Sequence, residues 1–356
     1  MNNKYGLICV SKILQEEDAK NSFSFLTKKE FLKTIESESD KKAIKKVEDL
    51  IIHNLKLTQK IIGFCRSVNI DHYRLNNSIF GLTQDPSVDL DLKSLPSFEL
   101  IQEELREVGR SSITNTITLS VQPDIFCKIY DEDDVLCASS ADQLNFYGWM
   151  LDTMGMQKNY SSPIILHIGN QPEQENHDSA IAFVDKFYEK YLELGDSAKK
   201  RIVLKHDDSG FWNAINLFKY FHVYCLEKHG FGFALSYDNL HDACNDSKIS
   251  GALIEQKVNV GAFYETWGGV VPVFTWAEAM EPGSSKPSAD YSALIPDFNY
   301  QIKWECEAKN RDKAILKLLK PDENMITEEQ ILNIVRKKYD DSTDFYNKLY
   351  SSNLVV

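Results

Sequence analysis

The stretch Arg201-Ile-Val-Leu-Lys-His-Asp-Asp208 places a short apolar run directly before a cluster of charged and imidazole side chains. The pattern recurs in Pro163-Ile-Ile-Leu-His167, in Phe233-Ala-Leu-Ser-Tyr-Asp238, which His241 follows, and in Tyr300-Gln-Ile-Lys-Trp-Glu-Cys-Glu307. A (β/α)8 barrel builds its active site from residues at the carboxyl ends of buried strands. The sequence therefore predicts an α/β fold with a functional site where these strands end.

Segments typical of strands and of helices alternate along most of the chain, as expected for parallel βαβ units. Eight strands are predicted, at Tyr5–Val10, His72–Leu75, Ile117–Val121, Ile164–Ile168, Arg201–Leu204, Phe233–Tyr237, Val271–Thr275 and Gln301–Cys306. Helical periodicity covers Lys41–Val68, Asp178–Leu194, Phe211–His229 and Thr327–Lys338. Eight units predict a single (β/α)8 TIM barrel over residues 1–320 and a C-terminal helical extension over residues 321–356; a doubly wound sheet with fewer strands is the alternative.

The composition is that of a globular protein, with 43% hydrophobic and 26% charged residues. A formal charge of -13 argues against general polyanion binding, because phosphate affinity comes from Lys and Arg. A local basic groove is still compatible with this charge. The seven Cys form no CxxC pair, and the chain shows neither a signal peptide nor an apolar membrane span. We therefore expect a cytoplasmic protein with reduced thiols and no membrane contact.

Four residues at the predicted strand ends are candidate ligands of a divalent metal such as Mn or Zn: His167, Asp238, His241 and Glu307. Each has an ordinary alternative role in a rim hydrogen bond, a turn or an ion pair. The four residues together are stronger evidence for a functional site, because each of them lies at or follows the carboxyl end of a predicted strand. The run from Lys205 to Asp208 adds a cation, an imidazole and two carboxylates, and such a density of ionisable groups favours a functional site.

Other classes of site have little support in the sequence. No P-loop and no G-x-G-x-x-G follows a predicted strand, so we expect no nucleotide cofactor. The sequence contains no G-x-S-x-G elbow, the motif that would indicate a serine hydrolase. Trp212, Trp267 and Trp276 lie near loops above the predicted barrel, where they could stack on nucleic-acid bases or pack in the core.

Several longer motifs occur in a characteristic order. Tyr73–Leu82 reads Y-R-L-N-N-S-I-F-G-L, similar to Y-R-[IL]-S-S-x-[IL]-F-P-L, and Leu119–Phe126 is similar to L-S-x-H-P-G-Q-[FY]. Asp238–Asn245 aligns with D-x-H-H-H-x-C-N, and Glu307–Lys309 with a terminal E-A-K. Over residues 5–317 the chain thus resembles the UV-damage endonuclease family, whose barrels are related to endonuclease IV and xylose isomerase.

This resemblance implies a function and a set of site residues. The family cuts DNA beside UV photoproducts and other lesions, using up to three divalent metals at the barrel mouth, where they activate water and stabilise the phosphoryl transition state. Damaged DNA is then the implied partner. The implied metal ligands are His167, Asp238, His241 and Glu307, with Asp85 as an altered ligand, and the implied substrate-binding residues are Asn76, Gln122, Phe126 and Trp276.

The chain departs from the family pattern at several ligands. Gln122, Thr275 and Ser288 replace histidines, and Lys205 replaces a glutamate that bridges two metals. An ammonium at this place repels a neighbouring cation by several kcal/mol even at an effective dielectric of about 20. We therefore expect at most one or two divalent ions, with Lys205 and His206 as the catalytic residues of what remains.

Two functional interpretations follow. In the first, the chain is a divergent member of this family with reduced or lost activity, whose mouth binds damaged DNA, a nucleotide or a protein partner. In the alternative, it is an active metal-dependent endonuclease that hydrolyses phosphodiesters at DNA lesions with one or two divalent cations. A sugar isomerase on the same type of barrel has only fold analogy in its favour.

Overall fold

The computed structural model describes residues 3–85, 87–245, 253–280, 289–292 and 294–319. The predicted C-terminal extension, its helix at Thr327–Lys338, and Ser288 lie outside these residues.

Each of the eight predicted strands is present, and every pairing between them is parallel. The strands are β1 (Asn3–Ile8), β2 (His72–Arg74), β3 (Thr118–Ser120), β4 (Ile164–His167), β5 (Ile202–Lys205), β6 (Ala234–Ser236), β7 (Val273–Trp276) and β8 (Ile302–Cys306). They form a five-stranded sheet in the order β3-β2-β1-β8-β7 and a three-stranded sheet in the order β4-β5-β6.

The two curled sheets meet at two seams. Val121 bridges Ile164 between β3 and β4, and Asp238 bridges Thr275 between β6 and β7. The α/β fold with parallel strands is therefore confirmed. Among the described residues, however, the hydrogen-bonded ladder of an eight-stranded barrel is interrupted at both seams, because only isolated bridges occur there.

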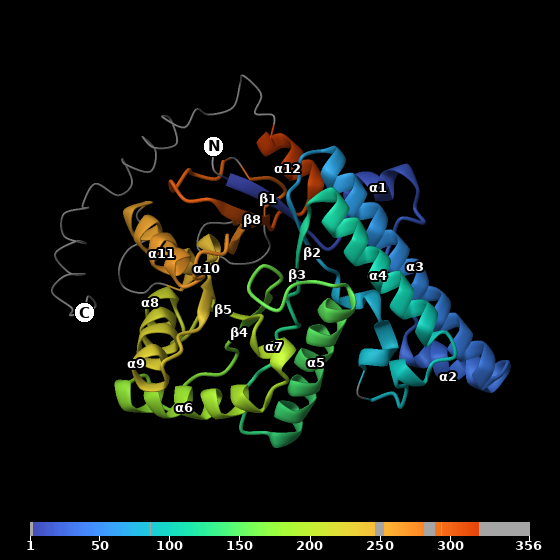
Figure 1. Cartoon of the computed structure of the whole chain (residues 1–356), viewed down its shortest axis with the longest axis horizontal. Coiled ribbons are helices and arrows are strands. Elements are labelled where there is room, and N and C mark those ends of the chain that lie inside the picture. Colours follow the sequence, from blue (N-terminus) through green and yellow to red (C-terminus); the bar gives the residue numbers. More distant parts are fainter. Residues whose placement is uncertain (1–2, 86, 246–252, 281–288, 293, 320–356) are drawn as a thin grey trace.

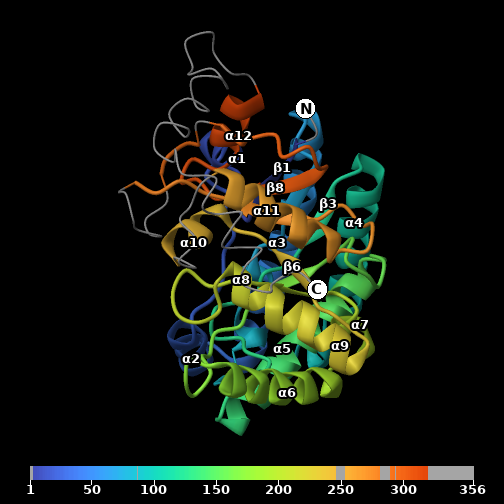
Figure 2. The ribbon, with the colours of Figure 1, turned by 90° about the vertical axis from the view of Figure 1, so that its left-hand side faces the viewer.

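Helices surround the strands, as the two perpendicular views show (Figure 1, Figure 2). The α-helices are α1 (Lys12–Glu17), α2 (Lys28–Ser37), α3 (Asp40–Ser67), α4 (Phe98–Asn115), α5 (Asp134–Thr153), α6 (His177–Glu193), α7 (Asp196–Lys199), α8 (Ala214–Leu217), α9 (Cys225–His229), α10 (Asn239–Cys244), α11 (Leu253–Glu265) and α12 (Asp312–Leu319). Three 3-10 turns are η1 (Asn77–Ile79), η2 (Gly81–Gln84) and η3 (Leu92–Ser94), and a π-helical turn, η4 (Phe218–Tyr224), joins α8 to α9. In the described part of the chain, no helix combines the length and apolarity needed to cross a membrane.

The predicted helices at Lys41–Val68 and Asp178–Leu194 are confirmed as α3 and α6, and the one at Phe211–His229 is interrupted by the π-helical turn η4. In α3, a cap and an apolar face coincide. The side chain of Ser39 accepts a hydrogen bond from the backbone of Lys42 and caps α3. Val47, Ile51 and Leu55 then follow at spacings of four residues and are buried. This face packs against the sheet and against α4, which runs alongside α3 in Figure 1.

A glycine sets how closely α4 approaches the end of α5. A Cβ added at Gly109 would overlap the carbonyl oxygen of Met154. We expect Gly109→Ala to lower the free energy of unfolding by about 1–3 kcal/mol, because the backbone must move apart. Gly63→Ala on α3 is the matched control, since a Cβ there meets nothing within 4 Å, and it should be neutral or stabilising by about 0.5–1 kcal/mol. Urea unfolding of both variants measures the difference; equal effects would contradict the close contact.

Candidate functional site

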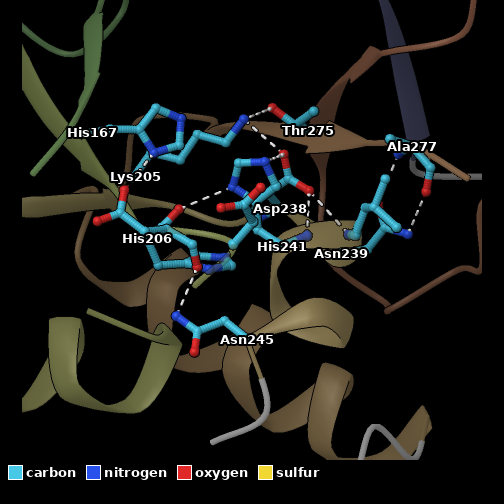
Figure 3. Close-up of polar contacts among 12 residues, drawn as sticks. His167, Lys205, His206, Asp238, Asn239, His241, Asn245, Thr275 and Ala277 are labelled. Atoms are coloured by element: carbon cyan, nitrogen blue, oxygen red, sulfur yellow. Dashed lines mark hydrogen bonds and ion pairs between the residues drawn. The ribbon is translucent and has the colours of Figure 1, made fainter. Parts of the chain in front are cut away.

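The site is assembled by consecutive strand ends (Figure 3). His167 is the last residue of β4 and lies in register with Lys205, the last residue of β5. Asp238 follows β6 and bridges Thr275 of β7. Since the strands are parallel, their carboxyl ends meet at one end of the sheets, as predicted.

The most direct contact in the site is a buried ion pair. The Nζ atom of Lys205 lies 2.7 Å from Oδ2 of Asp238, and both side chains are 1% exposed. The same ammonium donates a hydrogen bond to Oγ1 of Thr275 at 3.0 Å. Lys205 therefore reaches from β5 across to β7, and its charge is neutralised inside the site.

The other carboxylate oxygen of Asp238 is also engaged. Oδ1 accepts hydrogen bonds from the backbone N–H groups of Leu240 (2.9 Å) and His241 (3.0 Å), which caps α10. Burial would raise the pKa of this carboxyl, but the electrostatic effects of the neighbouring His241 and Lys205 side chains outweigh burial and hold the pKa well below its usual range. Asp238 is thus a permanent anion whose two oxygens both have partners.

His206 lies on the opposite side of the strand end from Lys205. Its ring is completely buried, and Nε2 accepts a hydrogen bond from the backbone N–H of Asp238 at 3.0 Å. Burial lowers the pKa of His206 well below that of a free imidazole, so the ring is neutral. His206 is not among the residues that line the adjoining pocket. Its contacts hold the start of the α10 loop, and its predicted catalytic role stays a prediction.

Two further histidines face each other near the ion pair. Nδ1 of His167 lies 2.9 Å from Oδ1 of Asp207. The rings of His167 and His241 are 5.2 Å apart between centroids, and Nδ1 of His241 lies 3.2 Å from the carbonyl oxygen of His206. Burial lowers the pKa of His167, although Asp207 opposes this effect.

These residues open onto a pocket of about 460 Å³. Of the predicted site residues, it is lined by Gln122, Phe126, His167, Lys205, His241 and Glu307. Asp207, Asp208, Lys128 and Gln171 also line it and were not predicted individually. The two aspartates belong to the charged run that indicated the site, whereas nothing in the sequence marked Lys128 or Gln171.

The remaining predicted residues lie elsewhere. Asp85 lines a neighbouring pocket of about 610 Å³, to which Phe126 also contributes. Asn76 caps η1 through a hydrogen bond from the backbone of Ser78. Trp276 is 6% exposed and packs edge-on against Trp304. Asp85 thus lines a pocket next to the site, and Trp276 contributes to the core.

The arrangement around Asp238 does not fit a metal ion. Both carboxylate oxygens already accept hydrogen bonds, and a cation bound there would have to displace the ammonium of Lys205. Within the described ranges, no group of three or more His, Cys, Asp or Glu side chains is arranged so that it could hold a metal ion. The predicted Mn or Zn stays a prediction for the other candidate ligands.

Comparison with known proteins decides the family. A family model described as "UV-endonuclease UvdE" matches residues 3–340. The chain belongs to this family. The resemblance in the motifs is thereby confirmed along nearly the whole sequence.

Curated relatives of this UvdE-family chain are distant in sequence. The UV-damage endonuclease of Schizosaccharomyces pombe is 22% identical over 316 residues, which cover 85% of this chain and 49% of that protein. The chain thus spans about half the length of that relative. The UV DNA damage endonuclease of Bacillus thuringiensis subsp. konkukian is 24% identical over 287 residues, covering 77% of this chain and 82% of that protein.

A solved structure shares the fold. The crystal structure of SacUVDE superposes with a TM-score of 0.67 at 18% sequence identity, covering 89% of this chain and 96% of that chain. At this identity the match supports the UvdE-type fold and leaves the site residues of this chain to be argued from their own contacts.

Proposed function

We propose that this UvdE-family protein recognises damaged DNA at the carboxyl ends of its strands and that its phosphodiester-cleaving activity is reduced or lost. The observation that carries the proposal is the ion pair between Lys205 and Asp238. In the motif alignment, Lys205 takes the position of a carboxylate that bridges two metals. Lys205 therefore supplies from within the chain the positive charge that a divalent ion would bring.

Exchanging this ammonium for a metal is energetically unfavourable. Removing one partner of a buried ion pair typically costs about 3–5 kcal/mol, because an uncompensated charge remains. Both Lys205 and Asp238 are 1% exposed, so water does little to relieve that charge. A metal at Asp238 would also meet the ammonium at close range. Metal-assisted activation of water at this position is accordingly weakened.

DNA as the ligand is supported by the family and by the surface of the pocket. The curated relatives are described as UV-damage endonucleases. Ile125 and Phe126 are 58% and 71% exposed at the edge of the pocket. Exposed aromatic side chains stack on unpaired bases, and a lesion makes a base easier to unstack. The net charge of -13 favours such a local contact over a long phosphate track.

The proposal includes the architecture that holds the site. We propose that the two sheets close into one (β/α)8 barrel, with the two isolated bridges as its seams. Support comes from the parallel direction of every strand and from the TM-score of 0.67 with SacUVDE. Glu307, after β8, already lines the same pocket as Lys205, as a closed barrel requires.

A second candidate function is metal-dependent cleavage with one or two cations. It is favoured by the chemistry of the acid and imidazole groups that line the pocket outside the Lys205–Asp238 pair, namely His167, Asp207 and Glu307, although within the described residues these groups are not arranged around one ion. Carboxylates and imidazoles are suitable ligands for Mn or Zn. This candidate differs from the main proposal in requiring lesion-dependent cleavage.

The test uses the full chain with UV-irradiated and untreated plasmid in the presence of Mn²⁺, together with a fluorescent duplex that carries one UV photoproduct. We expect preferential binding of the photoproduct duplex without lesion-dependent nicking. Phe126→Ala should weaken binding by about tenfold, the effect of one stacking contact. Phe25→Ala, a similarly exposed phenylalanine outside this pocket, is the control and should change little.

Lesion-dependent nicking by the wild type that Glu307→Gln abolishes would overturn loss of activity and support the second candidate. Equal affinity for the damaged and undamaged duplexes would overturn lesion recognition and leave a nucleotide or protein partner as the ligand class to examine.

A further inference from the structure

A second buried polar group surrounds Glu305 and includes neither Lys205 nor Asp238. Glu305 of β8 is completely buried. Its carboxylate lies 2.9 Å from NH2 of Arg74, 3.1 Å from Nε2 of His72, and accepts a hydrogen bond from Oγ of Ser120 at 2.5 Å. Burial would raise the pKa of Glu305, but Arg74 and His72 outweigh it and hold the pKa at about 2. Arg74 is thus anchored to a fixed anion.

The anchored guanidinium fixes the orientation of a pocket side chain. NH1 of Arg74 donates a hydrogen bond to Oε1 of Gln122 at 2.5 Å. Because a guanidinium can only donate, it must face the oxygen of the amide and not the nitrogen. The backbone carbonyl of Gln122 also accepts a hydrogen bond from Nδ2 of Asn77 at 2.7 Å. Gln122 is therefore held at its backbone and at one end of its amide.

The other end of this amide is left for the pocket. Gln122 lines the 460 Å³ pocket, whereas Arg74 is not among its lining residues. Within the described part of the chain, no group accepts a hydrogen bond from Nε2 of Gln122. The amide nitrogen is thus a donor whose direction is set before any ligand binds, and a preorganised donor binds with less loss of conformational entropy.

Each of the two neighbouring ammonium groups is held by two partners inside the chain. Nζ of Lys128 already donates to Asp131 and Asn170, and Nζ of Lys205 is engaged with Asp238 and Thr275. The carboxylates on the pocket wall are acceptors when ionised. A ligand with an exposed acceptor oxygen therefore finds in Gln122 an amide N–H that no group in the described part of the chain occupies.

We propose that Gln122 is a recognition residue that donates a hydrogen bond from Nε2 to an acceptor oxygen of bound DNA, and that Arg74, held by Glu305, is its positioning residue. This inference rests on the proposed function and assigns it a specific contact. The acceptor oxygen belongs to a backbone phosphate or to a nucleobase carbonyl, both of which accept hydrogen bonds from amides.

The test measures binding of fluorescent duplexes with and without one UV photoproduct to the full-length wild type and to Gln122→Glu. The glutamate keeps an acceptor for Arg74 but presents no donor to the ligand. We expect binding to weaken by about 10- to 100-fold, as for loss of one strong hydrogen bond. An equal loss on both duplexes identifies a phosphate oxygen, and a loss confined to the damaged duplex identifies a base oxygen.

Gln171→Glu is the matched control, because Gln171 lines the same pocket and its Oε1 accepts a hydrogen bond from the backbone of Phe211. A loss as large for Gln171→Glu as for Gln122→Glu would overturn the proposal, since added negative charge would then explain both. Unchanged binding by Gln122→Glu while the wild type binds DNA would overturn this inference alone. A wild type that binds neither duplex overturns the proposed function and this inference together.

The positioning role of Arg74 has its own readout. Arg74→Lys should weaken DNA binding in the wild-type background and have no further effect in the Gln122→Glu background, because the donor is already lost. An equal effect of Arg74→Lys in both backgrounds would overturn the positioning role. If Arg74→Lys does not fold, the comparison of Gln122→Glu with Gln171→Glu still decides whether Gln122 recognises DNA.

Discussion

Asp238→Asn is expected to lower the free energy of unfolding by about 3–5 kcal/mol, because it leaves the buried ammonium of Lys205 without its counter-charge. The asparagine is nearly isosteric, so the loss is electrostatic. Its amide is unsuited to the site in both orientations. With its oxygen toward Lys205, its nitrogen faces the N–H groups of Leu240 and His241 that Asp238 now caps; in the reverse orientation, two donors meet at Lys205.

Asp185→Asn provides the matched control for this prediction. Asp185 pairs with Lys228 at 2.6 Å, a similar separation, but the two side chains are 29% and 44% exposed. Exposed pairs contribute up to about 1 kcal/mol. The loss of unfolding free energy, measured by urea unfolding, should therefore be several-fold larger for Asp238→Asn than for Asp185→Asn. Losses of equal size would show that burial does not increase the contribution of the Lys205–Asp238 pair to stability.

Lys205→Glu is expected to make the stability of the protein depend on a divalent cation. The substitution places a second carboxylate beside Asp238, and two such charges about 4 Å apart repel by about 4 kcal/mol at an effective dielectric of 20. A metal between the carboxylates removes this repulsion, and ligands that bind only the native state raise its stability. We expect a low Tm in EDTA and a Tm that rises with Mn²⁺ or Zn²⁺ concentration.

Lys205→Met is the control, because it removes the ammonium without adding a ligand. It should be destabilised, since Asp238 loses its partner, and it should gain little from added metal. The wild type should keep the same Tm with and without chelator. A wild-type Tm that falls in EDTA, together with no response of Lys205→Glu to metal, would contradict the view that Lys205 stands in place of a cation.

Much of the fold was predictable because strands and helices carry local signals. Apolar runs bounded by turn residues located all eight strands, and capped periodic segments located α3 and α6. The interruptions at the two seams were not predictable. Whether three- or four-residue strands form a full ladder or one bridge depends on their twist in space, and no residue type near Val121 or Asp238 encodes it.

In the site, the sequence identified the ends of the strands correctly but not which side chains face the pocket. Successive residues of a strand point to opposite faces. Lys205 and Asp207 line the pocket, while His206 between them does not. Thr275 contacts Lys205, while the next residue, Trp276, packs on Trp304. Applying this alternation to the sequence would have assigned His206 and Trp276 to the surroundings.

The contact between Lys205 and Asp238 could not be predicted from the sequence for a different reason. The order of the strands places the two residues close together, and the replacement of a carboxylate by Lys205 was visible. Whether the ammonium repels a bound ion or forms its own contact depends on where its four-carbon side chain points. The 2.7 Å distance to Asp238 is a property of packing.

The pairing of β1 with β8 has a consequence for how the protein assembles during synthesis. The three-stranded sheet comes from one continuous stretch, from β4 to β6, whereas the five-stranded sheet joins Asn3 to Ile302. Pairing of distant segments must overcome a larger loop-closure entropy than pairing of near ones. On the ribosome, the middle of the chain can therefore form its sheet early, while β1 waits with an open edge until β8 has been made.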